Sequence, residues 1–114
     1  MGTQTPIACD MTAIPPDQRQ SHLATSRNLF AKIQEIRELE NGYEFRLADD
    51  PRLMSELAEF IALEKLCCPF LNFVIEVERE VGPVWLRLTG REGVKAFIRE
   101  EINGLLGVTI NWTV

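Results

Sequence analysis

The sequence predicts an α+β domain in which tandem ββα units form one antiparallel sheet with helices packed on one face. Two observations carry this prediction. Apolar residues alternate at period two in several short runs and recur at helical spacing in longer ones. Residues 33–66 and 70–104 also share one order of strand, tight turn, strand and helix, although few of their residues are identical. An N-terminal helix before these units and a short C-terminal strand after them complete the predicted domain.

The first half of the chain is expected to hold an extended segment, a helix and the first ββα unit. After the extended segment over residues 1–14, apolar residues at helical spacing predict a helix from about residue 16 to 31. Alternation then predicts two strands, and Asn41-Gly42 between them is typical of a tight turn that needs positive φ angles. Asp50 and Pro51 favour the start of the next helix. Its apolar stripe comprises Leu53, Met54, Leu57, Phe60 and Ile61.

The second half repeats this plan and adds a final strand. Pro69 is expected to end the preceding helix near Cys67, because the residue before a proline is pushed out of the α conformation. Alternation over residues 72–77 and 84–88 predicts a second hairpin with a turn around Gly82-Pro83. The third helix has a stripe made of Val94, Phe97, Ile98 and Ile102. Alternation of Val108, Ile110, Trp112 and Val114 predicts the C-terminal strand over residues 107–114.

Composition excludes several classes of function. With 114 residues, of which 46% are hydrophobic and 25% charged, the chain is expected to form a single soluble domain over residues 1–114. It has no apolar run near the roughly 20 residues that cross a bilayer and no secretory signal, so we expect a cytoplasmic protein without a membrane partner. A formal charge of -5 and scattered basic residues disfavour a nucleic-acid partner. Three cysteines cannot close a disulfide framework, which leaves the thiols free or metal-bound.

The segment FIALEKLCCPF concentrates the residues that can carry chemistry. Continuing the apolar stripe past Ile61 places Glu64, and then Cys67 and Cys68, at inward positions. A buried carboxylate needs a partner, a raised pKa or a metal, whereas a drift of the helix axis would leave Glu64 at a solvated edge. The two cysteines are likewise either core residues, since free cysteine is among the most buried residue types, or ligands.

Local electrostatics favour a metal over an activated nucleophile at this segment. Both thiols lie at the negative end of a helix and next to Glu64, and both influences raise the pKa of a thiol. A bound soft cation reverses this balance, because it deprotonates a coordinating thiol and supplies positive charge. Metal binding is therefore the function that the local charges favour.

Two distant residues are further candidate ligands. Cys9 alternates with Ile7 and Met11 along an extended segment, and His22 is the only histidine of the chain. The candidate metal ligands are Cys9, Cys67, Cys68, Glu64 and His22. Their thiols suit zinc, copper(I) or mercury(II), and softness alone does not choose among these ions. The sequence leaves open whether Cys9 and His22 reach the cysteine pair.

The residues around the pair also resemble a protein family. The segments LEKLCCPF, WLRLTG and GVK are similar to those of a small uncharacterised bacterial family with a Leu-Glu-x-x-Cys-Cys-Pro-Phe segment. The similarity covers about residues 8 to 103. Such proteins are associated with metal-resistance gene neighbourhoods, so the resemblance implies a site at Glu64, Cys67 and Cys68 without assigning an activity.

Three functions remain open from the sequence. The leading hypothesis is a small cytoplasmic protein that binds a thiophilic metal ion through its clustered cysteines, as an accessory to metal resistance. The first alternative is a thiol-dependent redox enzyme, although a lone histidine limits acid–base catalysis and no catalytic residue is assigned. The second alternative is a non-catalytic module with core cysteines, which forms a homodimer through a polar sheet face around Trp85 or through the C-terminal strand.

Overall fold

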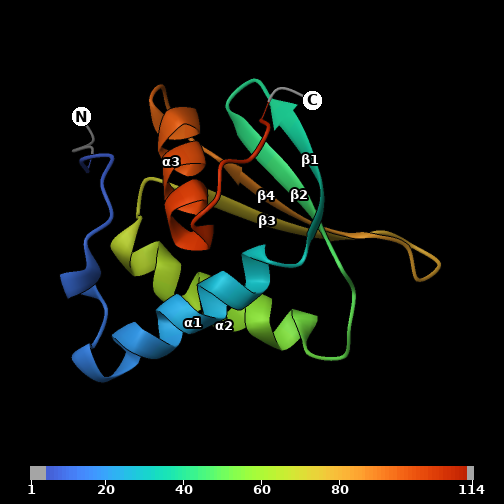
Figure 1. Cartoon of the computed structure of the whole chain (residues 1–114), viewed down its shortest axis with the longest axis horizontal. Coiled ribbons are helices and arrows are strands. Elements are labelled where there is room, and N and C mark those ends of the chain that lie inside the picture. The colour runs from blue at the N-terminus through green and yellow to red at the C-terminus, as the bar shows by residue number, and fades with distance from the viewer. Residues whose placement is uncertain (1–4, 113–114) are drawn as a thin grey trace.

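The computed structural model describes residues 5–112, which form three α-helices, two short 3-10 turns and a four-stranded sheet (Figure 1). In chain order the elements are η1 (Met11–Ala13), η2 (Pro16–Gln18), α1 (Arg19–Phe30), β1 (Ile33–Leu39), β2 (Gly42–Leu47), α2 (Leu53–Cys67), β3 (Asn72–Val77), β4 (Val84–Thr89) and α3 (Val94–Leu106). The predicted α+β class, with an N-terminal helix and helices packed on an antiparallel sheet, is confirmed.

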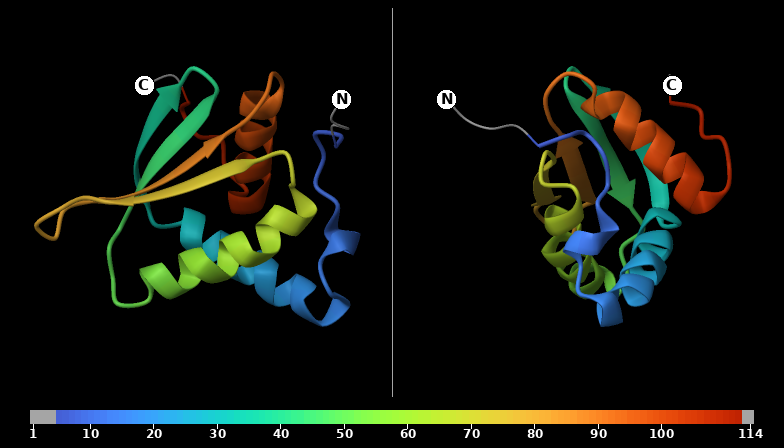
Figure 2. Two further views of the ribbon diagram at one scale, coloured as in Figure 1. Left: turned by 180° about the vertical axis from the view of Figure 1, so that it is seen from behind. Right: turned by 90° about the vertical axis from the view of Figure 1, so that its left-hand side faces the viewer.

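The sheet has the strand order β1-β2-β4-β3, with every neighbouring pair antiparallel. Each hairpin contributes its second strand to the centre, where Phe45 of β2 lies opposite Leu86 of β4. The order β1-β2-α2 and β3-β4-α3 reproduces the predicted tandem units. Figure 2 shows the helices gathered against one face of the sheet. Because α2 ends the first unit and β3 begins the second, the segment between them joins the two units.

The inward-facing residues of the two central strands form the middle of the core. Alternate side chains of β2 and β4 are buried, as period-two patterning requires when one sheet face is covered. These residues are Tyr43, Phe45 and Leu47 on β2, and Val84, Leu86 and Leu88 on β4. Leu53, Leu57 and Phe60 of α2 are buried against the same core, which fixes the orientation of that helix and of the site at its end.

The β1–β2 hairpin forms as expected, but its turn lies one residue earlier than the sequence pattern suggests. Leu39 pairs with Gly42, so Glu40 and Asn41 make the two-residue loop. The expected positive φ angles at Asn41 and Gly42 are wrong. Gly42 is required for a different reason: a Cβ at this position would lie 1.9 Å from the backbone carbonyl oxygen of Leu88.

We expect Gly42→Ala to lower the free energy of unfolding by about 3 kcal/mol, because a backbone oxygen of a central strand cannot move aside as a flexible side chain can. Urea denaturation measures the loss. Gly104→Ala is the matched control: nothing lies within 4 Å of a Cβ there, and alanine in a helix is favoured over glycine by about 0.5–1 kcal/mol. Equal stability of the Gly42→Ala variant and the unaltered chain would contradict the close approach of β2 and β4.

The β3–β4 hairpin projects from the body of the protein and turns through two residues in the left-handed region (Figure 1). Glu80 has φ 62° and Val81 has φ 55°. A β-branched residue is unfavourable in this conformation, and Val81 is 95% exposed, so packing does not offset the cost. The tip of this hairpin is therefore strained.

We expect Val81→Asn to raise the free energy of unfolding by about 1 kcal/mol, because asparagine tolerates the left-handed region far better than valine does. Thermal and urea unfolding both measure the gain. Val77→Asn is the control, since Val77 is 57% exposed but lies in the extended strand β3, where asparagine is disfavoured. A Val81→Asn variant no more stable than the Val77→Asn variant would count against strain at the tip.

Helix α2 ends where Pro69 was expected to stop it. Its last residue is Cys67, and Cys68 leaves the helix with φ -128° and ψ 63° while its N–H still donates to the carbonyl of Glu64 at 2.8 Å. This geometry lets adjacent cysteines turn toward each other, which they cannot do inside a regular helix. Of the helices within residues 5–112, none has the length and apolar character needed to cross a membrane.

The predicted C-terminal strand is wrong for residues 107–112, which form a turn followed by irregular chain; Thr113 and Val114 lie outside the described residues. Gly107, at φ 67°, ends α3 and redirects the chain. Trp112 then packs on Tyr43 with ring centroids 4.9 Å apart and donates its indole N–H to Oδ1 of Asn103 at 3.2 Å. Ile110 and Trp112 thus alternate because they pack onto the core and not because they pair in a sheet, whereas Val108 is exposed.

Trp85 does not give the outer sheet face an exposed tryptophan. Its side chain is only 4% exposed, and the guanidinium of Arg37 lies over its ring at 4.2 Å from the centroid. Beside it, Arg87 forms ion pairs across the strands with Glu44 and Glu76, each at 3.2 Å. Homodimer formation through this face or the C-terminal segment stays a prediction, and Trp85 would be available to a partner only if Arg37 moved.

Candidate metal centre

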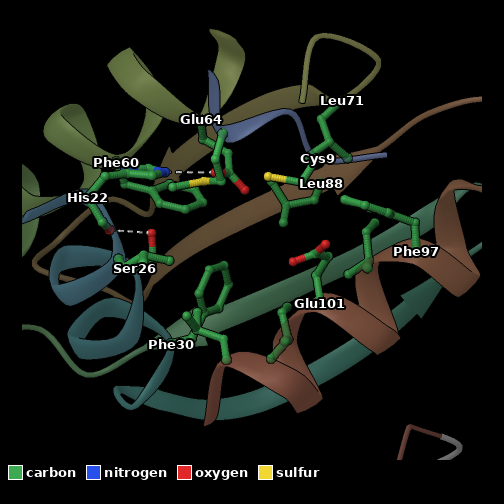
Figure 3. A pocket seen from close by; sticks show the side chains of 15 residues that line it. Cys9, His22, Ser26, Phe30, Phe60, Glu64, Leu71, Leu88, Phe97 and Glu101 are labelled. Atoms are coloured by element: carbon green, nitrogen blue, oxygen red, sulfur yellow. Dashed lines mark hydrogen bonds and ion pairs between the residues drawn. The ribbon is translucent and has the colours of Figure 1, made fainter. Parts of the chain in front are cut away.

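The sequence-predicted site residues come together where the N-terminal segment, α1 and the end of α2 meet. They form two overlapping groups whose ligand atoms all lie within 4.8 Å of one another. The first group is Cys9, Cys67 and Cys68, and the second is His22, Glu64 and Cys67. Figure 3 shows Cys9, His22 and Glu64 converging on one space from different elements. Both questions that the sequence left open, whether Cys9 and whether His22 reach the pair, are answered by this arrangement.

Backbone contacts hold Cys9 against the end of α2. The N–H of Asp10 donates to the carbonyl of Cys67 at 3.0 Å, and Ile14 buries its side chain in the core at the end of the same segment. The three thiols are free, with Cys67 and Cys68 buried and Cys9 half-buried. The segment that was expected to be extended therefore serves to bring a third thiol to the pair.

The sulfur spacing suits a shared ion. Thiolates bound to one ion at about 2.3 Å lie roughly 3.8 Å apart in a tetrahedral site and roughly 4.0 Å apart in a trigonal one. The sulfurs of Cys67 and Cys68 are 3.7 Å apart, and that of Cys9 lies within 4.8 Å of both. If the Cys9 side chain rotates so that its sulfur moves by about 1 Å, all three sulfurs can bind the same ion.

Glu64 points inward, as the continued apolar stripe predicted, and not toward a solvated edge. Its side chain is 19% exposed. One carboxylate oxygen lies 2.8 Å from Nε2 of His22 and 3.3 Å from Sγ of Cys67, and the other lies 3.7 Å from Sγ of Cys68. The carboxylate is thus placed both to hold the histidine and to act as a ligand beside the thiols.

His22 is a buried member of the site and not a surface histidine. Its side chain is 3% exposed and its ring stacks on Phe60, with centroids 5.9 Å apart and planes 18° apart. Ser26 donates its hydroxyl to the backbone carbonyl of His22 at 2.8 Å. The other ring nitrogen, Nδ1, is buried without a hydrogen-bond partner among residues 5–112. The ring is therefore held in place on one side and polar but unsatisfied on the other.

The thiols have strongly different acidities. Burial raises the pKa of Cys9 to about 12, and a hydrogen bond to Cys67 together with burial raises the pKa of Cys68 far above its usual range. The hydrogen bond from Cys68 lowers the pKa of Cys67 to about 6, against burial and with the help of His22. Burial disfavours the imidazolium, but hydrogen bonds to Cys67 and Glu64 outweigh it and raise the pKa of His22 to about 9. Near neutral pH the site holds one thiolate beside an imidazolium.

The expectation that all the thiols have raised pKa values is therefore right for Cys9 and Cys68 and wrong for Cys67. Glu64 acts in the expected direction, but the sequence did not show that Cys68 and His22 lie close enough to the Cys67 sulfur to lower its pKa. An activated thiolate is thus present in a place where the helix dipole opposes one.

A pocket lies beside the thiol cluster, between α1, α2, α3 and β4 (Figure 3). The empty space between its walls is about 540 Å³, including its open mouth. Most of its lining is apolar, with Phe30, Phe60 and Phe97 among the wall residues, and the polar part of the lining includes Cys9 and Glu64. The site is consequently open toward an apolar chamber on one side, and a second hollow, lined in part by Pro6, Cys9 and Cys67, lies on another.

Glu101 is a pocket residue that the sequence interpretation missed. It lies on α3, and Figure 3 shows its carboxylate directed into the pocket from the side opposite Cys9 and Glu64. Partial burial and the charge on Glu64 raise the pKa of Glu101. Helical spacing could have found this residue, because it lies one turn from Phe97 of the apolar stripe, on nearly the same face of α3.

The donor set can hold a metal ion: three thiols, a carboxylate and an imidazole converge in one partly enclosed space. The chain has no significant match among protein-family models, among curated proteins or among solved structures.

Proposed function

We propose that the protein binds a thiophilic metal ion through Cys9, Cys67 and Cys68, with Glu64 or His22 as a further ligand. The observation that carries the proposal is the approach of three free thiols, from two distant parts of the chain, to within 4.8 Å of one another. The Glu64 carboxylate and the Cys67 thiolate share the single positive charge of His22, so the site keeps negative charge that a bound cation would balance.

The local charges support the same proposal. Glu64 and the Cys67 thiolate place negative charge in one partly buried space, and His22 is the cationic side chain that interacts with them there. A soft cation would neutralise that charge and favour the thiolate forms of Cys9 and Cys68. Three thiolates alone suit a trigonal copper(I) or mercury(II) site, and a fourth ligand from Glu64 or His22 suits tetrahedral zinc.

Metal content and affinity test the proposal directly. Untagged protein is titrated with zinc, copper(I) and mercury(II) against a competing chelator, and the double variant Cys67→Ser/Cys68→Ser is titrated beside it. We expect one ion per chain and a loss of affinity of at least about 100-fold in the double variant. Circular dichroism confirms that the variant is folded. Equal affinity in both proteins, or no binding of any of the three ions, contradicts the proposal.

The role of the carboxylate needs a matched comparison. Glu64→Gln keeps the shape of the side chain but removes its charge, and Glu59→Gln makes the same change on an exposed residue of α2. We expect the Glu64 variant to lose about tenfold in affinity and the Glu59 variant to bind normally. Equal affinities would remove Glu64 from the site.

The acidity of Cys67 also favours a second candidate function, a thiol-dependent redox enzyme. Its thiolate, His22 and Glu64 form a chain of contacts of the kind that activates nucleophilic cysteines. A redox role requires Cys67 to form a reversible disulfide with Cys9 or Cys68. Mass spectrometry after mild oxidation and reduction distinguishes the functions: a disulfide that forms and is reduced without loss of protein supports the enzyme, and resistance to oxidation opposes it.

A cytoplasmic, metal-resistance role is part of the proposal and has the sequence resemblance as its support. It predicts that cells carrying the Cys67→Ser/Cys68→Ser variant are more sensitive to the cognate ion than cells with the unaltered chain. Growth in graded concentrations of that ion, with both proteins expressed at equal levels, provides the measurement.

A further inference from the structure

We propose that the cation taken by the thiol cluster is a small organometal: a soft metal, mercury(II) in the simplest case, that carries one short alkyl group, with the alkyl group lying in the pocket beside Cys9 and Glu64. This inference rests on the proposed function, because it names the substrate class of the same site. It follows from the walls, the size and the charge of the pocket.

The walls of the pocket change character away from the thiols. On the side of Cys9 and Glu64 the pocket presents donor atoms, whereas Phe30 and Phe97 present hydrocarbon across the same space, beside the carboxylate of Glu101 (Figure 3). A bare or hydrated ion gains nothing from hydrocarbon walls. An alkyl group attached to the ion does, because it leaves water for an apolar surface.

The size of the pocket limits the alkyl group. The cavity volume is about 60 Å³, and one water needs roughly 10–15 Å³. The pocket therefore has room for only a few atoms, which fits a metal with a methyl or ethyl group. A phenyl ring on the metal exceeds this space.

The charge of the pocket favours a cation over a neutral or anionic apolar ligand. Glu64 and Glu101 line it from opposite sides, and no lysine or arginine is among the residues that the structure places in its wall. A fatty acid would meet two carboxyl groups, and a plain hydrocarbon would leave the thiols unused. An alkylmercury cation satisfies both halves of the site.

The chemistry of capture is a simple ligand exchange at the metal. A thiol of the cluster replaces chloride or a small thiolate on R–Hg–X: the sulfur–mercury bond forms, the mercury–X bond breaks, and X leaves as an anion or as its protonated form. The thiol proton passes to solvent or to the leaving group. No electrons are transferred and the carbon–mercury bond stays intact.

Exchange against N-acetylcysteine tests the inference with the full chain. The equilibrium constant for transfer from N-acetylcysteine to the protein is measured for methylmercury, ethylmercury, phenylmercury and mercury(II). We expect transfer of ethylmercury to be about fourfold more favourable than transfer of methylmercury, the effect of one buried carbon. We expect no further gain for phenylmercury, because the ring does not fit. This series needs no variant protein.

A matched pair of variants places the effect in the pocket. Leu105→Trp fills the pocket from α3, and Leu106→Trp adds the same side chain at the next residue, which does not line it. We expect Leu105→Trp to abolish the difference between ethylmercury and methylmercury and to leave mercury(II) transfer unchanged, while Leu106→Trp preserves the difference.

The outcomes separate this inference from the proposed function. Favourable mercury(II) transfer with equal constants for methyl and ethyl, or a chain-length preference that survives in folded Leu105→Trp protein, overturns the organometal inference alone. Failure of the protein to take mercury(II) from N-acetylcysteine overturns the proposed function for this ion, and the inference with it.

Discussion

Ultraviolet titration of the metal-free protein is expected to show one thiol ionising near pH 6, with the other thiols protonated until far higher pH. The low value belongs to Cys67, whose pKa is lowered to about 6 by hydrogen bonds from Cys68 and His22. Cys9, with a pKa of about 12, and Cys68 absorb as thiolates only in strong base. Because the thiols interact, the transition near pH 6 is an apparent value for the coupled site.

Two variants assign that transition. Cys67→Ser should remove the low step, and His22→Gln should move it upward toward the ordinary thiol value of about 8.5, because the imidazolium no longer stabilises the thiolate. Leu23→Gln is the control, since Leu23 is the neighbouring residue on α1 and is 40% exposed. A first transition at or above about pH 8.5 in the unaltered protein would show that Cys68 and His22 do not lower the pKa of Cys67 in solution.

The elements of the fold were largely predictable because their signals are local. Alternation of Tyr43, Phe45 and Leu47 indicates a strand with one buried face, whichever strands lie next to it. Pro69 ends the helix before it because its ring is incompatible with a continuing helix. The hairpin turn was misplaced because Gly42 is required by its distance from β4, and no local pattern carries that information. The C-terminal segment shows the converse: Ile110 and Trp112 alternate because both pack on the core without pairing.

Part of the candidate site was also predictable from local sequence, and part of it depends on tertiary packing. Glu64, Cys67 and Cys68 are neighbours on one helix, so helical spacing alone placed them together. Cys9 and His22 were named by residue type, and their position beside the pair depends on how η1 and α1 pack against α2. The acidity of Cys67 could not be predicted, since its main causes are the direction of the Cys68 thiol and the approach of His22. Tertiary contacts, which a single sequence does not encode locally, determine the chemistry.

Binding of one thiophilic ion near neutral pH is expected to release about two protons. Cys9 and Cys68 are protonated there because their pKa values are raised, whereas Cys67 is already a thiolate. Three-thiolate coordination must displace the two remaining thiol protons, so affinity should rise about 100-fold for each unit of pH. Isothermal titration in buffers of different ionisation enthalpy counts the protons, after correction for hydrolysis of the free ion.

The proton count also identifies the fourth ligand. His22 carries a proton up to about pH 9, so coordination by its ring nitrogen would release one more proton and raise the count to about three. Glu64 accepts the hydrogen bond from His22 and would add no proton if it were the ligand. Cys9→Ser should lower the count by one in either case, because the thiol of Cys9 is protonated before binding. Release of no protons, or an affinity that does not change with pH, is incompatible with three coordinating thiolates, and a count unchanged in Cys9→Ser would leave only the Cys67–Cys68 pair in contact with the ion.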